Sequence, residues 1–175
     1  MVNYFELYGL PVSFRPDPGQ VKKKFYELSR QFHPDRFAQG GAEAVQEAIR
    51  MSALNNEAYR VLKDEDATLK FVLKFYGVLD EEEKYSLPPE FLMEMMELNE
   101  SVSELEIEQE DAALKASVSK AIQDHLNQWS AEVEPLLGQF QATEPDKDLL
   151  LKIKDYYFRK KYLKRIEGRA RKPGE

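Results

Sequence analysis

The tripeptide His33-Pro34-Asp35 places an imidazole beside a carboxylate, and both groups can transfer protons. A proline cannot continue a helix, and it keeps the residue before it out of the α region. We therefore predict that His33 and Asp35 lie in a loop with their side chains in water. A loop held between rigid helices is a common place for binding or catalysis.

A catalytic His33–Asp35 pair would need other groups beside it, such as a nucleophile, a phosphate-binding loop or a metal. The loop offers no serine or cysteine, no glycine-rich run and no paired metal ligands. The proline between the two residues also does not ensure that their side chains face each other. We therefore predict a binding role, with no catalytic residues, no metal and no cofactor.

The composition of the 175-residue chain is typical of a helical protein, with 42% hydrophobic and 33% charged residues. The absence of cysteine excludes disulfides, thiolate chemistry and cysteine-ligated clusters, and two histidines make a His-based metal site improbable. No apolar run approaches the roughly 18 residues that span a bilayer. The first residues lack the pattern of a signal peptide, so we expect a cytoplasmic protein without a membrane partner.

The charge is divided into three blocks. Residues 1–77 carry a net +1, residues 78–158 carry −14 and residues 159–175 carry +6. Such blocks indicate at least two functional regions with different partners. The acidic middle argues against nucleic acid, whose phosphates require a broad basic surface.

Two amphipathic helices are predicted on either side of the His33 loop, at about 18–32 and 42–63. Asp17 and Pro18 form a good helix start, and the apolar residues that follow recur at helical spacing. Each helix should bury one row of side chains: Val21, Phe25, Leu28 and Phe32 in the first, and Val45, Ile49, Ser52, Asn55, Tyr59 and Leu62 in the second. A short apolar helical turn at 4–11 should brace this hairpin. The solvent side of the first helix and the loop is cationic, with Lys22, Lys23, Lys24, Arg30 and Arg36.

This order of elements resembles the J domain of DnaJ-type co-chaperones over residues 3 to about 76. The matching features are Tyr-Phe-x-Leu at residues 4–7, the basic helix, His33-Pro34-Asp35, and Asn-Glu-Ala-Tyr-Arg-Val-Leu at residues 56–62. The resemblance implies that His33, Pro34 and Asp35 dock on a DnaK-type chaperone and stimulate its ATPase. The same docking would use Lys22, Lys23, Arg30 and Arg36. Alternatively, those cations form an ordinary solvated face, but their position beside the loop favours docking.

A short helix at 67–77 ends at Gly77, and an acidic run at 80–83 with Pro88 and Pro89 predicts a connector over 78–89. Three helical segments then follow, at 90–109, 111–141 and 146–167. Their short connections predict an antiparallel three-helix bundle over 90–175. The predicted architecture is therefore all-α, with a J-domain hairpin at 1–77 joined to this bundle.

The first bundle segment carries apolar residues on two faces. Phe91, Met95, Leu98, Val102 and Leu105 repeat at spacings of four and three, so they should form the buried row. Leu92, Met93 and Met96 fall off this row, beside Glu97, Glu100 and Glu104. They are either an exposed docking surface or a surface that packs on the J domain, and periodicity does not decide between these.

The other two segments have buried rows of their own. The second runs from Leu114 to Phe140 and includes His125 as a core-edge residue, and Pro135 should kink or interrupt its end. In the third, Leu149, Ile153, Tyr156 and Leu163 should face inward, whereas Leu151, Phe158 and Tyr162 should face away. The basic tail at 159–172 is either a solvated helix end or a contact for an acidic partner.

The motif Phe-Leu-Met-Glu-x-x-Glu-Leu-x-Glu at residues 91–100, placed after a J domain, resembles the HscB family of iron–sulfur cluster biogenesis. The Val-Leu-x-x-x-Gly ending at Gly77 fits the same family. Thr68-Leu69 stands where the family usually has Arg-Ala. The sequence contains no four-cysteine extension of the kind that some animal members carry, so it resembles the bacterial form of the family.

The resemblance implies that the bundle binds an IscU-type scaffold and delivers it to an HscA-type chaperone. Its implied scaffold contacts are Leu92, Met93, Met96, Glu97, Glu100 and Glu104, with Tyr162 or Phe158 from the last helix. A rival function is a general J-domain holdase that binds unfolded chains through its exposed Leu and Met side chains.

Overall fold

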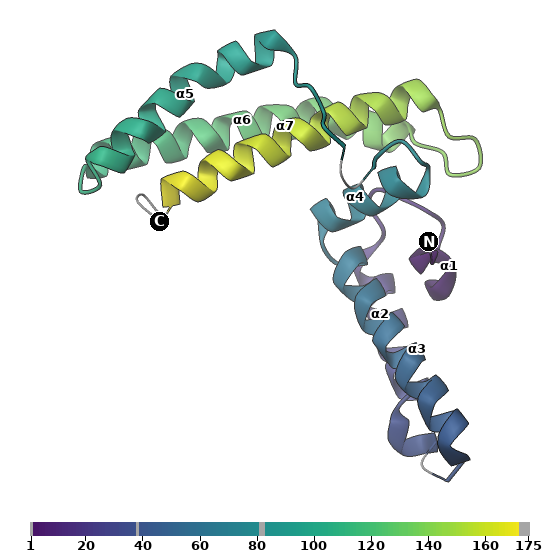
Figure 1. Ribbon diagram of the computed structural model, residues 1–175. Helices are drawn as coiled ribbons and strands as arrows, with labels where there is room; N and C mark the ends of the chain where they lie inside the picture. The colour runs from purple at the N-terminus through teal and green to yellow at the C-terminus, as the bar shows by residue number, and fades with distance from the viewer. Residues whose placement is uncertain (1, 38, 81–82, 172–175) are drawn as a thin grey trace. The chain divides into compact units, whose positions relative to one another are not determined.

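The computed structural model describes residues 2–37, 39–80 and 83–171, and its regular elements are all helical (Figure 1). The described chain divides into two compact units. One contains residues 1–79 with the loop 140–145, and the other contains 80–139 and 146–175. No helix among the described residues has the length and apolar character needed to cross a membrane.

Unit 1 is the expected helical hairpin with its brace. It contains α1 (Tyr4–Tyr8), α2 (Pro18–Gln31), the 3₁₀ turn η1 (Pro34–Phe37), α3 (Gly41–Leu62) and α4 (Glu65–Phe75). Asp17 caps α2 through its carboxylate, which accepts the Gln20 amide at 2.7 Å. Gly9 ends α1 in the left-handed region at φ 61°, which a glycine adopts without strain.

A buried polar network joins α1, α2 and α3. The Tyr8 hydroxyl donates to the Asn55 side-chain oxygen at 2.9 Å. The Asn55 amide donates to the Phe25 carbonyl and to the Ser29 hydroxyl, both at 3.0 Å. Burial of the Tyr8 hydroxyl raises its pKa above the ordinary tyrosine value. Asn55 therefore joins the two long helices of the hairpin at one point through two bonds, and a third bond ties α1 to them.

One expectation for this unit is wrong. Ile49 is 53% exposed, because Ala48 rather than Ile49 is buried on this turn of α3. The residues of the predicted connector 78–89 pack in both units: Leu79 is buried in unit 1, and Tyr85 and Leu87 pack within unit 2. Two residues of the predicted acidic run, Glu81 and Glu82, lie outside the described residues.

The loop 140–145 contributes to unit 1 although it joins two bundle helices in sequence. The Phe140 ring packs edge-on against Phe14 and Tyr76, at centroid distances of 4.8 and 5.5 Å. The Tyr76 hydroxyl donates to the Ala142 carbonyl at 3.0 Å. The loop thus carries an aromatic anchor that the end of the predicted second bundle segment did not reveal.

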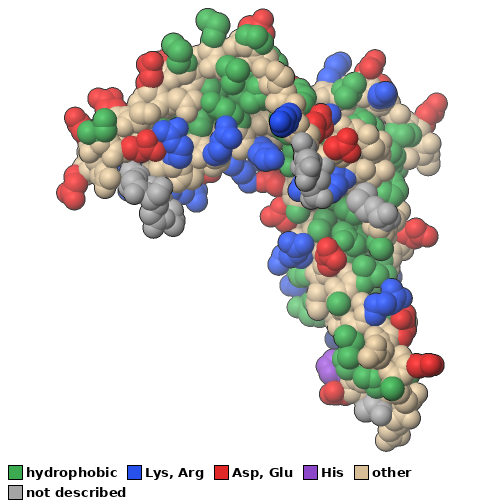
Figure 2. Space-filling view, in the orientation of Figure 1, with side chains coloured by type: hydrophobic (Ala, Val, Ile, Leu, Met, Phe, Trp, Pro, Cys, Tyr) green, Lys and Arg blue, Asp and Glu red, His purple; other side chains and the backbone are tan. Residues whose placement is uncertain are grey.

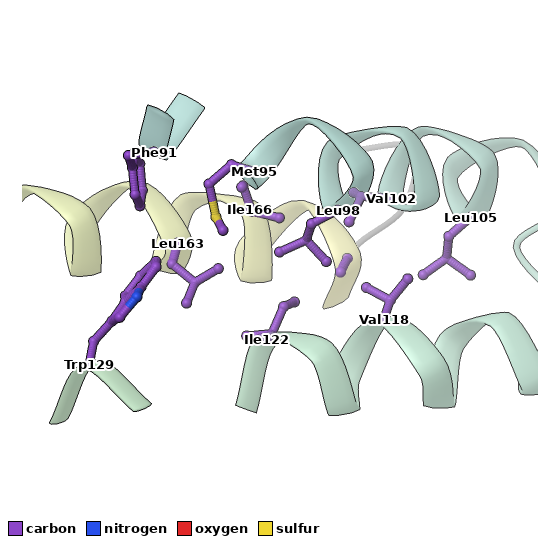
Figure 3. Close-up of a cluster of buried hydrophobic side chains, with 11 residues drawn as sticks. Phe91, Met95, Leu98, Val102, Leu105, Val118, Ile122, Trp129, Leu163 and Ile166 are labelled. Atoms are coloured by element: carbon purple, nitrogen blue, oxygen red, sulfur yellow. The ribbon is translucent and has the colours of Figure 1, made fainter. Parts of the chain in front are cut away.

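Unit 2 is a three-helix bundle of α5 (Pro89–Ile107), α6 (Ala112–Gln139) and α7 (Lys147–Arg171), and each helix packs on the other two. Figure 3 shows the core row of α5 pointing between α6 and α7, where it meets side chains from both. The buried residues of this row are those predicted: Phe91, Met95, Leu98, Val102 and Leu105. The α6 helix continues through Pro135 to Gln139, so Pro135 does not interrupt it, and a kink at this residue stays a prediction.

We predict that Asn55→Ala destabilises the protein by about 2–3 kcal/mol, because it removes the side-chain hydrogen bonds that Asn55 makes with Tyr8, Phe25 and Ser29. Urea unfolding followed by circular dichroism measures this change. The exposed neighbour Asn56→Ala is the matched control and should change the free energy of unfolding by less than about 0.5 kcal/mol. Equal effects of the two substitutions would contradict the network's role.

Candidate protein-binding surfaces

The His33 loop is ordered by its own backbone. The last turn of α2 closes at Phe32, whose amide donates to the Leu28 carbonyl at 2.9 Å. The turn η1 then begins at Pro34. The Arg36 amide then donates to the His33 carbonyl at 3.0 Å. The Arg36 guanidinium reaches back to the Arg30 carbonyl, also at 3.0 Å. The tripeptide is therefore held in a compact turn rather than in an irregular loop.

The side chains of this turn face water. His33 and Asp35 are 58% and 91% exposed, and their nearest charged atoms, Nδ1 and Oδ2, are 3.6 Å apart. No group of three or more His, Cys, Asp or Glu side chains in the described parts of the chain could hold a metal ion. The tripeptide is thus presented outward, as a surface that another molecule can contact.

A cationic surface extends along α2 and onto the turn η1. Lys22, Lys23, Arg30 and Arg36 are all exposed. Lys24 instead pairs with Glu27 at 3.0 Å, and this contact holds the pKa of Glu27 below its usual value. The predicted chaperone-binding residues are therefore accessible on one hairpin.

The outer face of α5 carries the second candidate surface. Leu92, Met93 and Met96 are 44%, 74% and 60% exposed. Their neighbours Glu97, Glu100 and Glu104 are exposed as well. We call these six residues the α5 patch. Isolated exposed apolar side chains are common, but three on one face with a carboxylate border are typical of a docking surface.

The two aromatic residues predicted to face away from the core are only partly exposed. Tyr162 packs edge-on against Phe91 at a centroid distance of 5.6 Å, and its hydroxyl accepts from the Asn99 amide at 3.1 Å. Phe158 stacks on Tyr85 at 4.2 Å. The expectation for both is wrong, because the segment before α5 and α5 itself cover this side of α7. Tyr162 nevertheless lies directly beside α5, which brings it close to the α5 patch.

Sequence reasoning missed the role of residues 83–87, which line α7. The buried Lys154 ammonium pairs with Glu83 at 2.5 Å, and the Tyr85 hydroxyl donates to the Asp155 carboxylate at 2.7 Å. Burial and the bond to Asp155 raise the pKa of Tyr85 to about 12. The only sequence signal was the alternation of Glu83, Tyr85 and Leu87, which is too short to assign.

Sequence reasoning also missed Arg169, which joins α7 to α5. Its guanidinium donates twice to Glu106 at 2.9 Å and once to the Asn99 side-chain oxygen at 3.2 Å. A fourth donation goes to the Ser103 hydroxyl at 3.4 Å. The guanidinium holds the pKa of Glu106 below its usual value. Arg169 follows Arg165 by four residues and Tyr162 by seven. This helical spacing would have placed all three residues on the same flank of α7.

Comparison with known proteins gives the family. The family model described as the HSCB C-terminal oligomerisation domain matches residues 87–171. The co-chaperone protein HscB homolog of Vibrio vulnificus strain YJ016 is 37% identical over 145 residues, which cover 80% of this chain and 82% of the relative. The Vibrio atlanticus homolog is 36% identical over 138 residues, covering 76% and 81%.

The chain belongs to the HscB family of co-chaperones.

Solved structures agree with this assignment. Chaperone HscB from Vibrio cholerae matches with a TM-score of 0.72 at 26% identity, covering 97% of this chain and 96% of that one. The crystal structure of human co-chaperone protein HscB matches in fold, with a TM-score of 0.79 at 24% identity, covering 98% and 81%. The predicted family and the predicted all-α class, a J-domain hairpin with a three-helix bundle, are both confirmed.

We predict that Tyr85→Phe removes part of the alkaline sensitivity of this HscB-family chain. The raised pKa of Tyr85 means that its bond to Asp155 stabilises the fold below about pH 10, and that this stabilisation is lost as the pH rises to about 12. Wild type should therefore lose more stability than Tyr85→Phe across this interval in urea unfolding. If the free energies of unfolding of the two proteins change in parallel with pH, the Tyr85–Asp155 bond does not cause the alkaline loss of stability.

Proposed function

We propose that this HscB-family protein is a bivalent adaptor without an active site. Unit 1 stimulates the ATPase of an HscA- or DnaK-type chaperone, and unit 2 presents an IscU-type iron–sulfur scaffold to it. The observation that carries the proposal is the pair of exposed, chemically different surfaces on separate units of one co-chaperone chain. We further propose that it acts in the cytoplasm.

The surface for the chaperone is proposed to be His33, Pro34 and Asp35 with Lys22, Lys23, Arg30 and Arg36. Exposed cations can steer encounter with an acidic surface and speed association. The turn supplies a rigid element of defined shape next to them. The chemistry of ATP hydrolysis then belongs wholly to the chaperone.

The surface for the scaffold is proposed to be the α5 patch with Tyr162. Its apolar side chains can provide the desolvated centre of an interface, and its carboxylates the polar rim. Phe158 has weaker support, because its ring is stacked on Tyr85. We therefore place Tyr162, which contacts α5 directly, ahead of Phe158 as the aromatic contact from α7.

Linking the two surfaces supplies the mechanism. A scaffold bound to unit 2 is carried with the chaperone bound to unit 1, so its transfer to the chaperone becomes nearly intramolecular. ATP hydrolysis triggered by unit 1 would then trap the scaffold on the chaperone. The adaptor needs no cofactor for this role.

His33→Gln should abolish ATPase stimulation and leave the fold intact, because the side chain is exposed and makes few packing contacts. Steady-state ATPase of the cognate chaperone measures the stimulation, and thermal unfolding checks the fold. Scaffold binding should be unchanged, because the α5 patch is in the other unit. Full stimulation by the variant would refute the J-domain role.

The double variant Leu92→Ala/Met96→Ala should weaken scaffold binding by about 2–4 kcal/mol, as central interface residues do. Titration calorimetry with the IscU-type scaffold measures the loss. The melting temperature should change little, since both side chains are exposed, whereas buried core residues cost about 2–5 kcal/mol each. A large fall in melting temperature would indicate a packing surface instead.

The same double variant separates scaffold delivery from a general holdase. A holdase would bind an unfolded reference chain through Leu92, Met93 and Met96, and the double variant would lose that binding. The proposed adaptor binds the folded scaffold and ignores the unfolded chain. Capture of both proteins by wild type would contradict the proposed specificity.

A further inference from the structure

Two cations on α7, Lys161 and Arg165, differ from those around them. Arg159 pairs with Asp155 at 2.6 Å, Arg169 with Glu106 at 2.9 Å and Arg171 with Glu167 at 2.6 Å. Within the described residues, neither Lys161 nor Arg165 has a carboxylate partner, and both are exposed. Their charges are therefore available to another molecule.

Both cations lie over aromatic rings on the flank of α7 that borders α5. The Lys161 ammonium is 5.9 Å from the centroid of Phe158, and the Arg165 guanidinium is 4.9 Å from the centroid of Tyr162. Tyr162 in turn contacts Phe91 and Asn99 of α5. Figure 2 shows a row of Lys and Arg side chains along α7, next to hydrophobic side chains of the bundle.

The apolar part of the α5 patch lies toward the same border. Leu92, Met96, Asn99 and Ser103 follow each other at spacings of four, three and four, so they share one flank of α5. Asn99 and Ser103 accept bonds from Arg169, which places that flank against α7. Glu97, Glu100 and Glu104 lie farther round the helix, away from α7. Across the bundle the surface therefore runs from cations, through apolar side chains, to carboxylates.

We propose that the scaffold-docking surface continues from the α5 patch onto α7, where Lys161 and Arg165 receive an acidic segment of the same scaffold. This inference rests on the proposed function of the α5 patch. A guanidinium that lies over a ring can still use its N–H groups to bind a carboxylate in a bidentate manner. The opposite charges on the two sides of the apolar band would fix the orientation in which the scaffold docks.

A nucleic acid is a poorer occupant of this surface. The two cations are four residues apart on one helix, a span of about 6 Å, whereas phosphate binding uses a broad basic surface. The carboxylates of the α5 patch lie across the apolar band and would repel a polyanion. A short acidic protein segment meets the cations without crossing that border.

The test is a charge reversal, Lys161→Glu/Arg165→Glu, measured against the folded IscU-type scaffold by surface plasmon resonance at low and high salt. We expect affinity to fall at least about tenfold at low salt, chiefly through a slower association rate, and the loss to shrink as salt screens the charges. The control Lys115→Glu/Lys120→Glu makes the same change of net charge on α6, where both lysines are exposed. It should change affinity less than about twofold.

The outcomes separate this inference from the proposed function. If Leu92→Ala/Met96→Ala weakens scaffold binding while Lys161→Glu/Arg165→Glu does not, the extension onto α7 is wrong and the α5 patch stands. If neither variant weakens binding, the α5 patch fails and the extension fails with it. Equal losses in the α7 variant and the α6 control would show a bulk charge effect and overturn the inference. Melting temperatures confirm that each variant is folded.

Discussion

A helix in a three-helix bundle can bury only the face that its two neighbours cover, and α5 carries apolar residues on a wider arc than that face. Its core row fills the space between α6 and α7, so Leu92, Met93 and Met96 remain at the surface of the bundle. Leaving them exposed forgoes apolar burial worth about 1.5–3 kcal/mol for a side chain of this size. The residues that weaken the isolated fold are thus those suited to bind a partner.

In unit 1, polar groups help to hold the two helices of the hairpin together. Its α2 helix presents lysines and arginines to solvent, so its attachment to α3 depends on few apolar residues, of which only Val21 is fully buried. The network around Asn55 adds directional bonds at the centre of this pairing. A rigid pair of helices can then hold the His33 turn at one end, where none of the described residues of η1 is buried.

Helical spacing predicted every long helix and the whole core row of α5, because each of these buries a single periodic face. On α7 it predicted Leu149, Ile153 and Leu163, which are buried, but it missed Leu150 and Ile166, which are buried as well. The contacts of Tyr85, Phe140 and Arg169 are long-range in sequence, so no local pattern indicates them. The exposed site residues of α2 and α5 were easier to predict than Phe158 and Tyr162 of α7, since a residue off the buried row of an amphipathic helix faces solvent unless a neighbouring segment covers it.

The central claim is that one chain must carry both surfaces, and a complementation assay tests it most directly. ATPase of the cognate chaperone is measured with scaffold and an equal mixture of His33→Gln and Leu92→Ala/Met96→Ala, each of which retains one intact surface. If linkage supplies the effective concentration, the mixture gives the stimulation of the second variant alone and none of the extra stimulation that wild type gives with scaffold. Recovery of the wild-type response by the mixture would show that the surfaces act independently, and would contradict the adaptor mechanism.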